Sequence, residues 1–231
     1  MNPIMDAPLA AAALFAGYAL LPTGCCFGRQ YCRRMKRRRD PRLFLTFDDG
    51  PSVRYTGAFL DLLRDYQIHA TFFVVASFAG DNPELIARMR QEGHLVCLHS
   101  YAHADGWLEP PAKTEQDFRQ SLAVMDALNQ RVRYYRPPFG LLSLSAVREL
   151  RRYGLSPVLW DVMTQDWRGD TSAQIIAGKL LRRAKGGRII CLHDGRGTNC
   201  APGRTLEALK MTLPVLLRAG YRFDTIDHYE A

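Results

Sequence analysis

The sequence predicts an α/β fold in which a parallel sheet closes, or nearly closes, into a TIM-like barrel behind an N-terminal hydrophobic helix. Beyond Arg42, short β-rich runs alternate with helical patterns and are joined by short connections. The chain has 231 residues, of which 47% are hydrophobic, so it can bury one core of barrel size. A doubly wound open sheet is the alternative, although no glycine-rich phosphate loop follows the first strand.

Each element follows from its periodicity and from the turn residues at its ends. Asn82 and Pro83 begin one helical pattern and Gly93 ends it, while Ser143 is placed to cap another. The seven expected strands cover residues 43–47, 70–76, 94–98, 132–136, 155–160, 188–192 and 221–226. The six expected helices cover about residues 55–66, 83–92, 114–129, 143–153, 171–184 and 205–219. This alternation favours the barrel.

The N-terminal stretch from Ala7 to Gly28 contains no charged residue and is rich in Ala and Leu, long enough for one membrane span of about 20 residues. A membrane anchor is the favoured interpretation. A cleaved signal peptide and a helix that lies on a surface or is buried stay open as alternatives. The expected domains are an anchor or signal-like helix at 1–28, a basic juxtamembrane linker at 29–42 and a catalytic domain at 43–231.

Positive charge is concentrated directly after this stretch. The chain carries a net charge of +8, and residues 1–42 account for +6 of it, with all their basic residues between Arg29 and Arg42. Only Tyr31 interleaves with these arginines, which argues against nucleic-acid binding. Because basic flanks stay on the cytoplasmic side of a span, we expect the catalytic domain to lie at the cytoplasmic face, drawn toward anionic headgroups.

The six cysteines form neither a spaced disulfide framework nor a CxxC pair. They are Cys25, Cys26, Cys32, Cys97, Cys191 and Cys200. Cys97 and Cys191 each stand two residues before a histidine inside an apolar strand, so we expect both to be small core residues.

The run from Thr46 to Pro51, TFDDGP, places two adjacent carboxylates, Asp48 and Asp49, at the end of an apolar strand. Read alone, it could be an ordinary turn, because Asp and Gly favour turns. His99 and His103 are four residues apart, a spacing that puts both rings on one face of a helical turn and is typical of metal ligands. We therefore expect Asp49, His99 and His103 to hold Zn²⁺ or a similar divalent ion.

Unusual polar residues follow the carboxyl ends of several predicted strands. They are Asp48, Asp49, His99, His103, Arg136, Asp161, Asp166 and His193. In a barrel these strand ends share one rim, where catalytic residues collect. The sequence therefore predicts one site that combines metal ligands with acid and base groups.

Five motifs over residues 43–227 resemble those of the polysaccharide deacetylases, carbohydrate esterase family 4, in order and spacing. They are TFDDGP, HSYAH, the stretch Arg136 to Gly140, the stretch that ends in Asp166 and Trp167, and Leu192-His193. The resemblance implies a distorted (β/α)7-type barrel and a metal, Zn²⁺ or another divalent ion such as Co²⁺, Mn²⁺ or Ni²⁺. The implied reaction is hydrolysis of N-acetyl groups on amino sugars of a polysaccharide, peptidoglycan or lipid-linked glycan.

The resemblance also implies a role for each site residue. Asp48 would be the general base on the attacking water, oriented by Arg136. His193 would be the general acid, paired with Asp166. A backbone N–H near Phe139 would stabilise the oxyanion. Substrate contacts would come from Pro138, Phe139, Trp167 and Leu192.

Two departures put the substrate preference in question, since Phe139 replaces a frequent tyrosine and Met163 a frequent acid. The expected partners are an N-acetylated glycan or lipid-linked amino sugar and a membrane surface, with no nucleic acid and no protein partner. The alternatives are a deformylase or deacetylase of a lipid-linked sugar precursor and a carbohydrate-binding domain whose catalysis has lapsed. An intact acid and base pair argues against the lapsed domain, because binding alone needs neither Asp48 nor His193.

Overall fold

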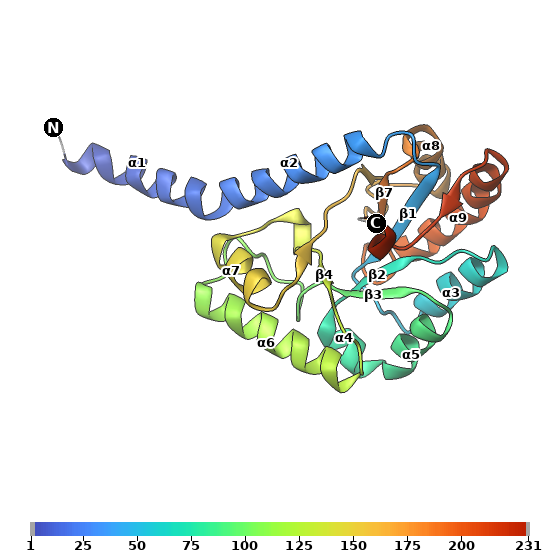
Figure 1. The fold of residues 1–231 in the computed structure, drawn as a ribbon, viewed down its shortest axis with the longest axis horizontal. Coiled ribbons are helices and arrows are strands. Elements are labelled where there is room, and N and C mark those ends of the chain that lie inside the picture. Colours follow the sequence, from blue (N-terminus) through green and yellow to red (C-terminus); the bar gives the residue numbers. More distant parts are fainter. Residues whose placement is uncertain (1–2, 230–231) are drawn as a thin grey trace.

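The structure, a computed structural model, describes residues 3–229, so the predicted domain limits at residues 1 and 231 lie outside it. A curled, fully parallel sheet stands at the centre and helices surround it (Figure 1). The strands are β1 (Arg42–Asp48), β2 (Thr71–Val74), β3 (Leu95–Leu98), β4 (Tyr134–Tyr135), β5 (Ser156–Pro157), β6 (Val162–Met163), β7 (Ile189–His193) and β8 (Arg222–Phe223). Their order is β5-β4-β3-β2-β1-β7-β6, with β8 paired to the start of β1.

The helices of the barrel lie in the connections between strands. They are α3 (Thr56–Asp65), α4 (Ala76–Asp81), α5 (Pro83–Gln91), α6 (Pro111–Ala127), α7 (Leu144–Arg152), α8 (Ala173–Arg183) and α9 (Ala201–Arg218), with 3₁₀ turns η2 (Pro138–Gly140) and η3 (Ile226–His228). The predicted parallel α/β barrel is confirmed. Two elements differ from expectation, since α4 was not predicted and the expected strand 155–160 is instead β5, followed by a separate β6.

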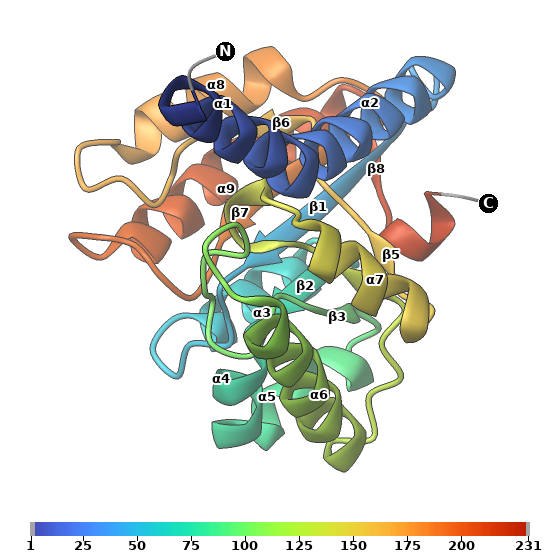
Figure 2. The same cartoon turned by 90° about the vertical axis from the view of Figure 1, so that its left-hand side faces the viewer.

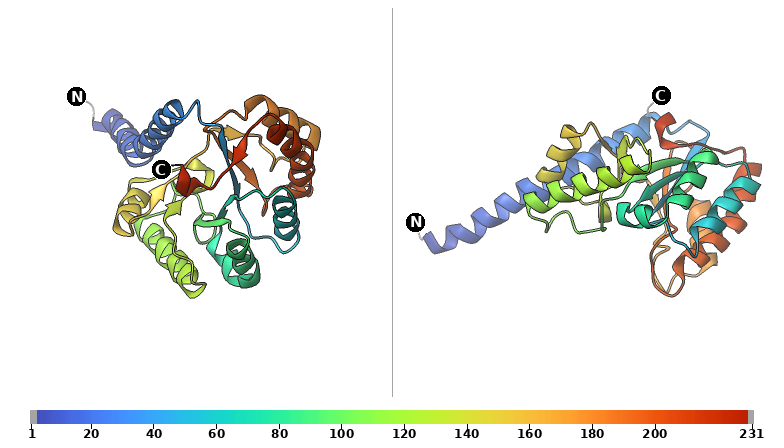
Figure 3. Two further views of the ribbon diagram at one scale, coloured as in Figure 1. Left: turned by 45° about the vertical axis from the view of Figure 1, so that its right-hand side comes forward. Right: turned by 90° about the horizontal axis from the view of Figure 1, so that it is seen from below.

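The sheet leaves a seam between its two end strands, β5 and β6, which do not pair with each other. The N-terminal helix covers this seam. It consists of α1 (Pro3–Phe15), a π-helical turn η1 (Ala16–Leu20) and α2 (Leu21–Lys36). In Figure 3 the α2 segment occupies a place in the ring of helices between α7 and α8, while α1 projects beyond the body of the barrel. Figure 2 shows the same helix crossing above α7.

Alternate residues of β1 face the two sides of the sheet, as strand geometry requires. Leu45 and Phe47 pack with the surrounding helices in the larger hydrophobic cluster. Phe44 packs inside the barrel with Phe73 and Ile189. Asp48 shares the inner face with Phe44, and β1 therefore delivers a carboxylate to the top of the barrel interior.

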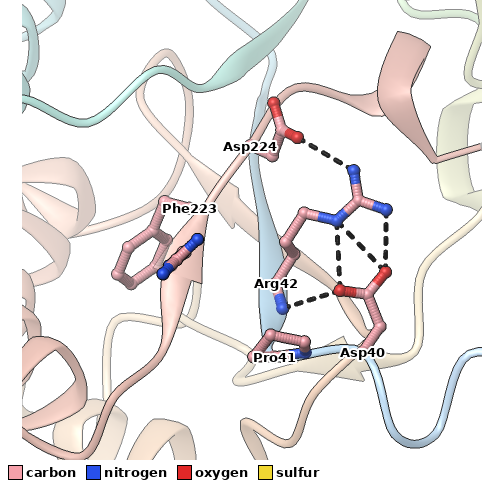
Figure 4. A pocket seen from close by; sticks show the side chains of 6 residues that line it. Asp40, Pro41, Arg42, Phe223 and Asp224 are labelled. Atoms are coloured by element: carbon pink, nitrogen blue, oxygen red, sulfur yellow. Dashed lines mark hydrogen bonds and ion pairs between the residues drawn. The ribbon is translucent and has the colours of Figure 1, made fainter.

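The amino-terminal end of the barrel holds a pocket of about 470 Å³ beside the start of β1. The guanidinium of Arg42 donates to Asp40 at 2.9 Å and to Asp224 at 3.1 Å (Figure 4). Arg37 also pairs with Asp40 at 3.2 Å, so two guanidinium groups balance the two carboxylates. These ion pairs join the segment before β1 to the segment after β8. This pocket has a structural explanation and does not point to a ligand.

Candidate functional site

A pocket of about 310 Å³ opens at the carboxyl ends of the strands. Its lining residues are Asp48, Asp49, His99, His103, Phe139, Trp160, Met163, Trp167, His193, Arg196 and Gly197. They come from six different connections of the fold. The predicted rim is therefore a single cavity that combines carboxylates, imidazoles and an aromatic wall.

The three predicted metal ligands converge in this pocket. Oδ1 of Asp49 lies 3.0 Å from Nε2 of His103 and 3.3 Å from Nε2 of His99. The ligand atoms of all three residues lie within 4.8 Å of one another. Burial opposes ionisation of Asp49, but the adjacent imidazoles of His103 and His99 outweigh it and hold the pKa of Asp49 well below its usual range.

This donor set fits a divalent cation. Nδ1 of His99 lies 2.7 Å from the carbonyl oxygen of Arg136, and donation there directs the Nε2 lone pair toward Asp49. Oδ1 of Asp49 is buried with no hydrogen-bond partner among the described residues. A carboxylate oxygen and two imidazole nitrogens so close together are all electron-pair donors, and a cation between them would satisfy each one.

His99 and His103 come together through a loop and not through the helical turn that their spacing suggested. Ser100 and His103 have positive φ angles of 70° and 58°, and these angles turn the second ring back toward the first. Asp49 has a φ of 72°, which brings its carboxylate to the same pocket as that of Asp48. Strain of this kind in non-glycine residues is typical of functional sites.

Gly50 is required by close packing behind the two carboxylates. A Cβ atom at this position would lie 2.5 Å from the side-chain oxygens of Asp194. The Asp194 carboxyl is buried, and burial raises its pKa to about 7. Its Oδ2 accepts a hydrogen bond of 2.5 Å from the Thr56 hydroxyl. Asp194 was not predicted as a site residue, since only the fold places it beneath the DDG turn.

Arg136 and Asp48 form a fully buried ion pair. One guanidinium nitrogen of Arg136 lies 2.5 Å from Oδ1 of Asp48 and also donates to the Thr46 hydroxyl at 2.7 Å. The guanidinium carbon lies 3.9 Å from the ring centroid of Phe73, so the ring covers one face of the cation. These contacts leave the Asp48 carboxylate in one orientation at the floor of the pocket.

Asp166 and His193 form the second pair. Oδ1 of Asp166 lies 3.0 Å from Nδ1 of His193, and Oδ2 accepts from the backbone N–H of His193 at 2.9 Å. Burial lowers the pKa of His193, but the charge and hydrogen bond of Asp166 outweigh this effect and raise the pKa to about 9, helped by Asp49 and Asp48. The pair therefore keeps a protonated imidazole at the pocket.

Of the four residues predicted to contact substrate, two line the pocket and two do not. Phe139 and Trp167 line it, and the Phe139 ring contacts that of His103 at a centroid distance of 4.9 Å. Pro138 is buried, and Leu192 is fully buried in the helix-facing core. Trp160 and Arg196 also line the pocket. They were not predicted, because nothing in the local sequence distinguishes a pocket residue from a core or surface residue.

Asp161 does not lie at the rim, contrary to expectation. Its Oδ2 accepts from the backbone N–H of Ile189, at the start of β7, and from Gln30 of α2. Asp161 directly precedes β6, so it sits at the opposite end of that strand from the pocket. The error arose because the chain forms two short strands where one was predicted.

Cys97 and Cys191 are buried core residues, as predicted. Cys191 also lies with Asp48 and His193 in a second group of possible ligand atoms. Its thiol donates to Oδ2 of Asp48 at 3.2 Å, and burial raises its pKa well above the usual value. A protonated thiol is a poor ligand, and this contact explains the group as a hydrogen bond to Asp48.

A sequence profile of the family described as polysaccharide deacetylase matches residues 35–158. The chain is 35% identical over 196 residues to the peptidoglycan-N-acetylglucosamine deacetylase PgdA of Listeria monocytogenes, covering 83% of this chain and 39% of the relative's length. It is 34% identical to a chitooligosaccharide deacetylase of Bradyrhizobium over 189 residues, covering 78% of this chain and 86% of that protein. The structure of the peptidoglycan deacetylase PdaC from Bacillus subtilis superposes with a TM-score of 0.75 at 28% identity, covering 84% of this chain and 91% of that one.

Proposed function

The chain belongs to the polysaccharide deacetylase family, and from this we propose that it is a metal-dependent hydrolase that removes N-acetyl groups from amino sugars of a glycan. The observation that carries the proposal is the convergence of a cation-binding set and two charged acid and base pairs in one pocket. Family membership alone would not be enough, because a fold can persist after its chemistry is lost. A protein that only bound sugar would need neither pair.

Asp49, His99 and His103 would hold the metal, with Zn²⁺ the ion we favour. When bound, such an ion polarises the amide carbonyl and lowers the pKa of water. Asp48 takes the proton from the attacking water, and Arg136 holds its carboxylate in the orientation for that transfer.

His193 gives its proton to the nitrogen of the departing amine. Asp166 occupies the Nδ1 side of the ring, so Nε2 is the nitrogen that faces the pocket. Asp166 also stabilises the imidazolium before it reacts. We assign stabilisation of the oxyanion to a backbone N–H near Phe139, whose φ of 57° turns this segment.

The acyl group would lie against the apolar wall of the pocket. Trp160, Met163 and Trp167 are the apolar lining residues in question, and the Trp167 ring contacts His193 at a centroid distance of 5.0 Å. A methyl group placed there is shielded from water next to the proton donor. Met163 gives this wall an apolar surface in place of the acid common in the family.

A deacetylase or deformylase of a lipid-linked amino sugar is the second candidate. The observation that favours it is the contact between Phe27 of α2 and Trp160 of the pocket wall, with ring centroids 6.4 Å apart. In the proposal, residues 43–231 are the catalytic domain and residues 1–28 with the basic segment 29–42 attach it to a membrane. One helix, Leu9–Lys36, is long and apolar enough to be a membrane anchor or a signal sequence. The basic segment favours the cytoplasmic face.

The test incubates the metal-loaded full-length protein with chitin oligomers, peptidoglycan fragments or lipid-linked amino sugars and measures released acetate and formate. Acetate from a soluble glycan supports the first candidate. Release from the lipid-linked sugar alone supports the second. If none of the substrates loses an acyl group while the protein binds one divalent ion, the hydrolase proposal is wrong and sugar binding remains.

A further inference from the structure

The N-terminal helix is docked on the barrel through one of its faces. The Thr23 hydroxyl donates to the carbonyl of Leu142 at 3.0 Å, and it accepts from the Leu142 N–H at 2.9 Å and from Nε1 of Trp107 at 3.1 Å. Two turns further on, Gln30 donates to Asp161 at 3.2 Å. Thr23 and Gln30 are both buried, so these contacts hold α2 along its length against the seam of the sheet.

The opposite face of α2 is exposed and uncharged. At 100° per residue, its members fall within an arc of about 120° that points away from Thr23 and Gln30. They are Leu21, Gly24, Cys25, Gly28, Tyr31, Cys32 and Met35, all of them exposed. Leu21 is 64% exposed, Tyr31 55% and Met35 43%. We call this set the outer face.

Basic residues lie along one edge of the outer face. On the same helical projection, Arg29 and Lys36 lie next to Cys25 and both are exposed. Their long side chains can place an apolar stem beside the stripe and a cationic head farther out. An exposed apolar stripe bordered by cations is typical of helices that lie in the plane of an anionic membrane surface.

The docking contacts favour a helix on the membrane surface over the predicted transmembrane span. A span over residues 7–28 would carry Thr23 and Phe27, with the barrel attached, into the hydrocarbon. Nearer the N-terminus, Phe15 also contacts Trp107 of the barrel, with ring centroids 5.8 Å apart.

We propose that the outer face lies in the headgroup region of an anionic lipid bilayer, with the helix parallel to the membrane and the barrel on its other side. Leu9 and Leu14 of α1 are also exposed, so apolar surface continues toward the N-terminus. The occupant is a bilayer because the exposed cations of Arg29 and Lys36 beside the stripe complement anionic headgroups. The helix then separates the membrane from the seam by about one helix diameter, 10 Å.

The first test is co-sedimentation of the full-length protein with phosphatidylcholine vesicles that contain or lack phosphatidylglycerol. The wild-type protein should pellet with the phosphatidylglycerol vesicles. The double variant Leu21→Glu/Met35→Glu should bind at least 10-fold more weakly, because charges at the centre of the stripe must then be desolvated. The matched control is Met211→Glu/Val215→Glu, which adds the same charges at exposed apolar positions on α9 and should bind like wild type.

The contribution of positive charge to binding is tested by Arg29→Gln/Lys36→Gln, the two cations that border the stripe. Two basic residues near an anionic surface contribute about 30-fold to binding, and this gain should disappear in phosphatidylglycerol vesicles. Equal binding of the wild-type protein to both kinds of vesicle would overturn the electrostatic part of the proposal. If wild-type protein is a dimer in vesicle-free solution and Leu21→Glu/Met35→Glu is a monomer, the outer face is a self-association surface and the proposal is wrong.

Two further measurements test the proposal without depending on whether the double variant folds. The first labels Cys32 with an environment-sensitive bimane fluorophore in a Cys25→Ser/Cys200→Ser background, and its emission should shift to the blue when phosphatidylglycerol vesicles are added. The matched control labels Cys200 in a Cys25→Ser/Cys32→Ser background and should show no shift.

The second measurement is alkaline carbonate extraction of cell membranes, which should release the protein. Retention in the membrane would establish a span. None of these readouts requires hydrolysis, so they test the membrane proposal independently of the proposed activity.

Discussion

Replacing Asp48 with Asn should reduce both catalysis and stability, and the second effect can be worked out from the structure. The Arg136 guanidinium is 0% exposed and lies 2.5 Å from Oδ1 of Asp48. Asn keeps the size of the side chain but removes the counter-charge, which leaves a buried cation uncompensated. Breaking a buried pair in this way costs about 3–5 kcal/mol in the free energy of unfolding.

Urea denaturation followed by far-UV circular dichroism measures this cost, with a chelator present throughout so that metal binding makes no contribution. The matched control is Asp61→Asn. Asp61 also pairs with an arginine at a short distance, 2.6 Å to Arg88, but its side chain is 54% exposed. The same substitution at this surface pair should cost less than about 1 kcal/mol.

An equal loss of stability in the two variants, or a smaller loss in Asp48→Asn than in Asp61→Asn, would contradict this expectation. Water or a local rearrangement would then compensate the buried charge of Arg136. The catalytic effect is measured separately on metal-loaded protein. Asp48→Asn should lower turnover by a factor of about 10²–10⁴, the usual contribution of a positioned base, while metal content stays close to that of the wild type.

Three further predictions concern the metal, the acid and a histidine outside the site. Asp49→Asn and His103→Ala should each lose the bound divalent ion and with it hydrolysis, measured by elemental analysis after dialysis, and full metal occupancy in either variant would contradict the ligand assignment. His193 works as an acid only while protonated, so activity should persist up to about pH 9 and fall as pH rises through that value. Asp166→Asn should move this alkaline limb to lower pH, and an unmoved limb in the kcat profile would separate it from His193. His94 is buried, which lowers its pKa from 6.5 to about 4, so the folded state resists a proton that the unfolded chain accepts. Stability should therefore fall by up to about 3 kcal/mol as pH decreases from 6.5 to 4, and His94→Leu should lose this dependence in urea titrations, whereas an unchanged pH slope would assign it to another group.

Much of the fold could be predicted because its signals are local. Alternating short strands and helices, the proline at Pro83 and the serine cap at Ser143 lie within a few residues of what they specify. The prediction failed where an element is held mainly by distant contacts. β6 has two residues and exists because Val162 and Met163 pair with β7. No periodicity can appear in so short a segment.

The sequence by itself determined most of the candidate site residues, because acids, histidines and an arginine after successive parallel strands are expected at the carboxyl edge of the sheet, although Asp161 lies at the other end of its strand. The tertiary structure decided how they meet. Positive φ angles at Asp49 and His103 turn their side chains toward one point. Arg136 pairs with Asp48, which lies 88 residues away in the sequence. It also decided that the hydrophobic helix packs over the seam of the barrel, where Thr23 bonds to Leu142 across 119 residues. An apolar stretch has the same composition whether it enters lipid or packs on protein, so only the position of its polar partners distinguishes the two.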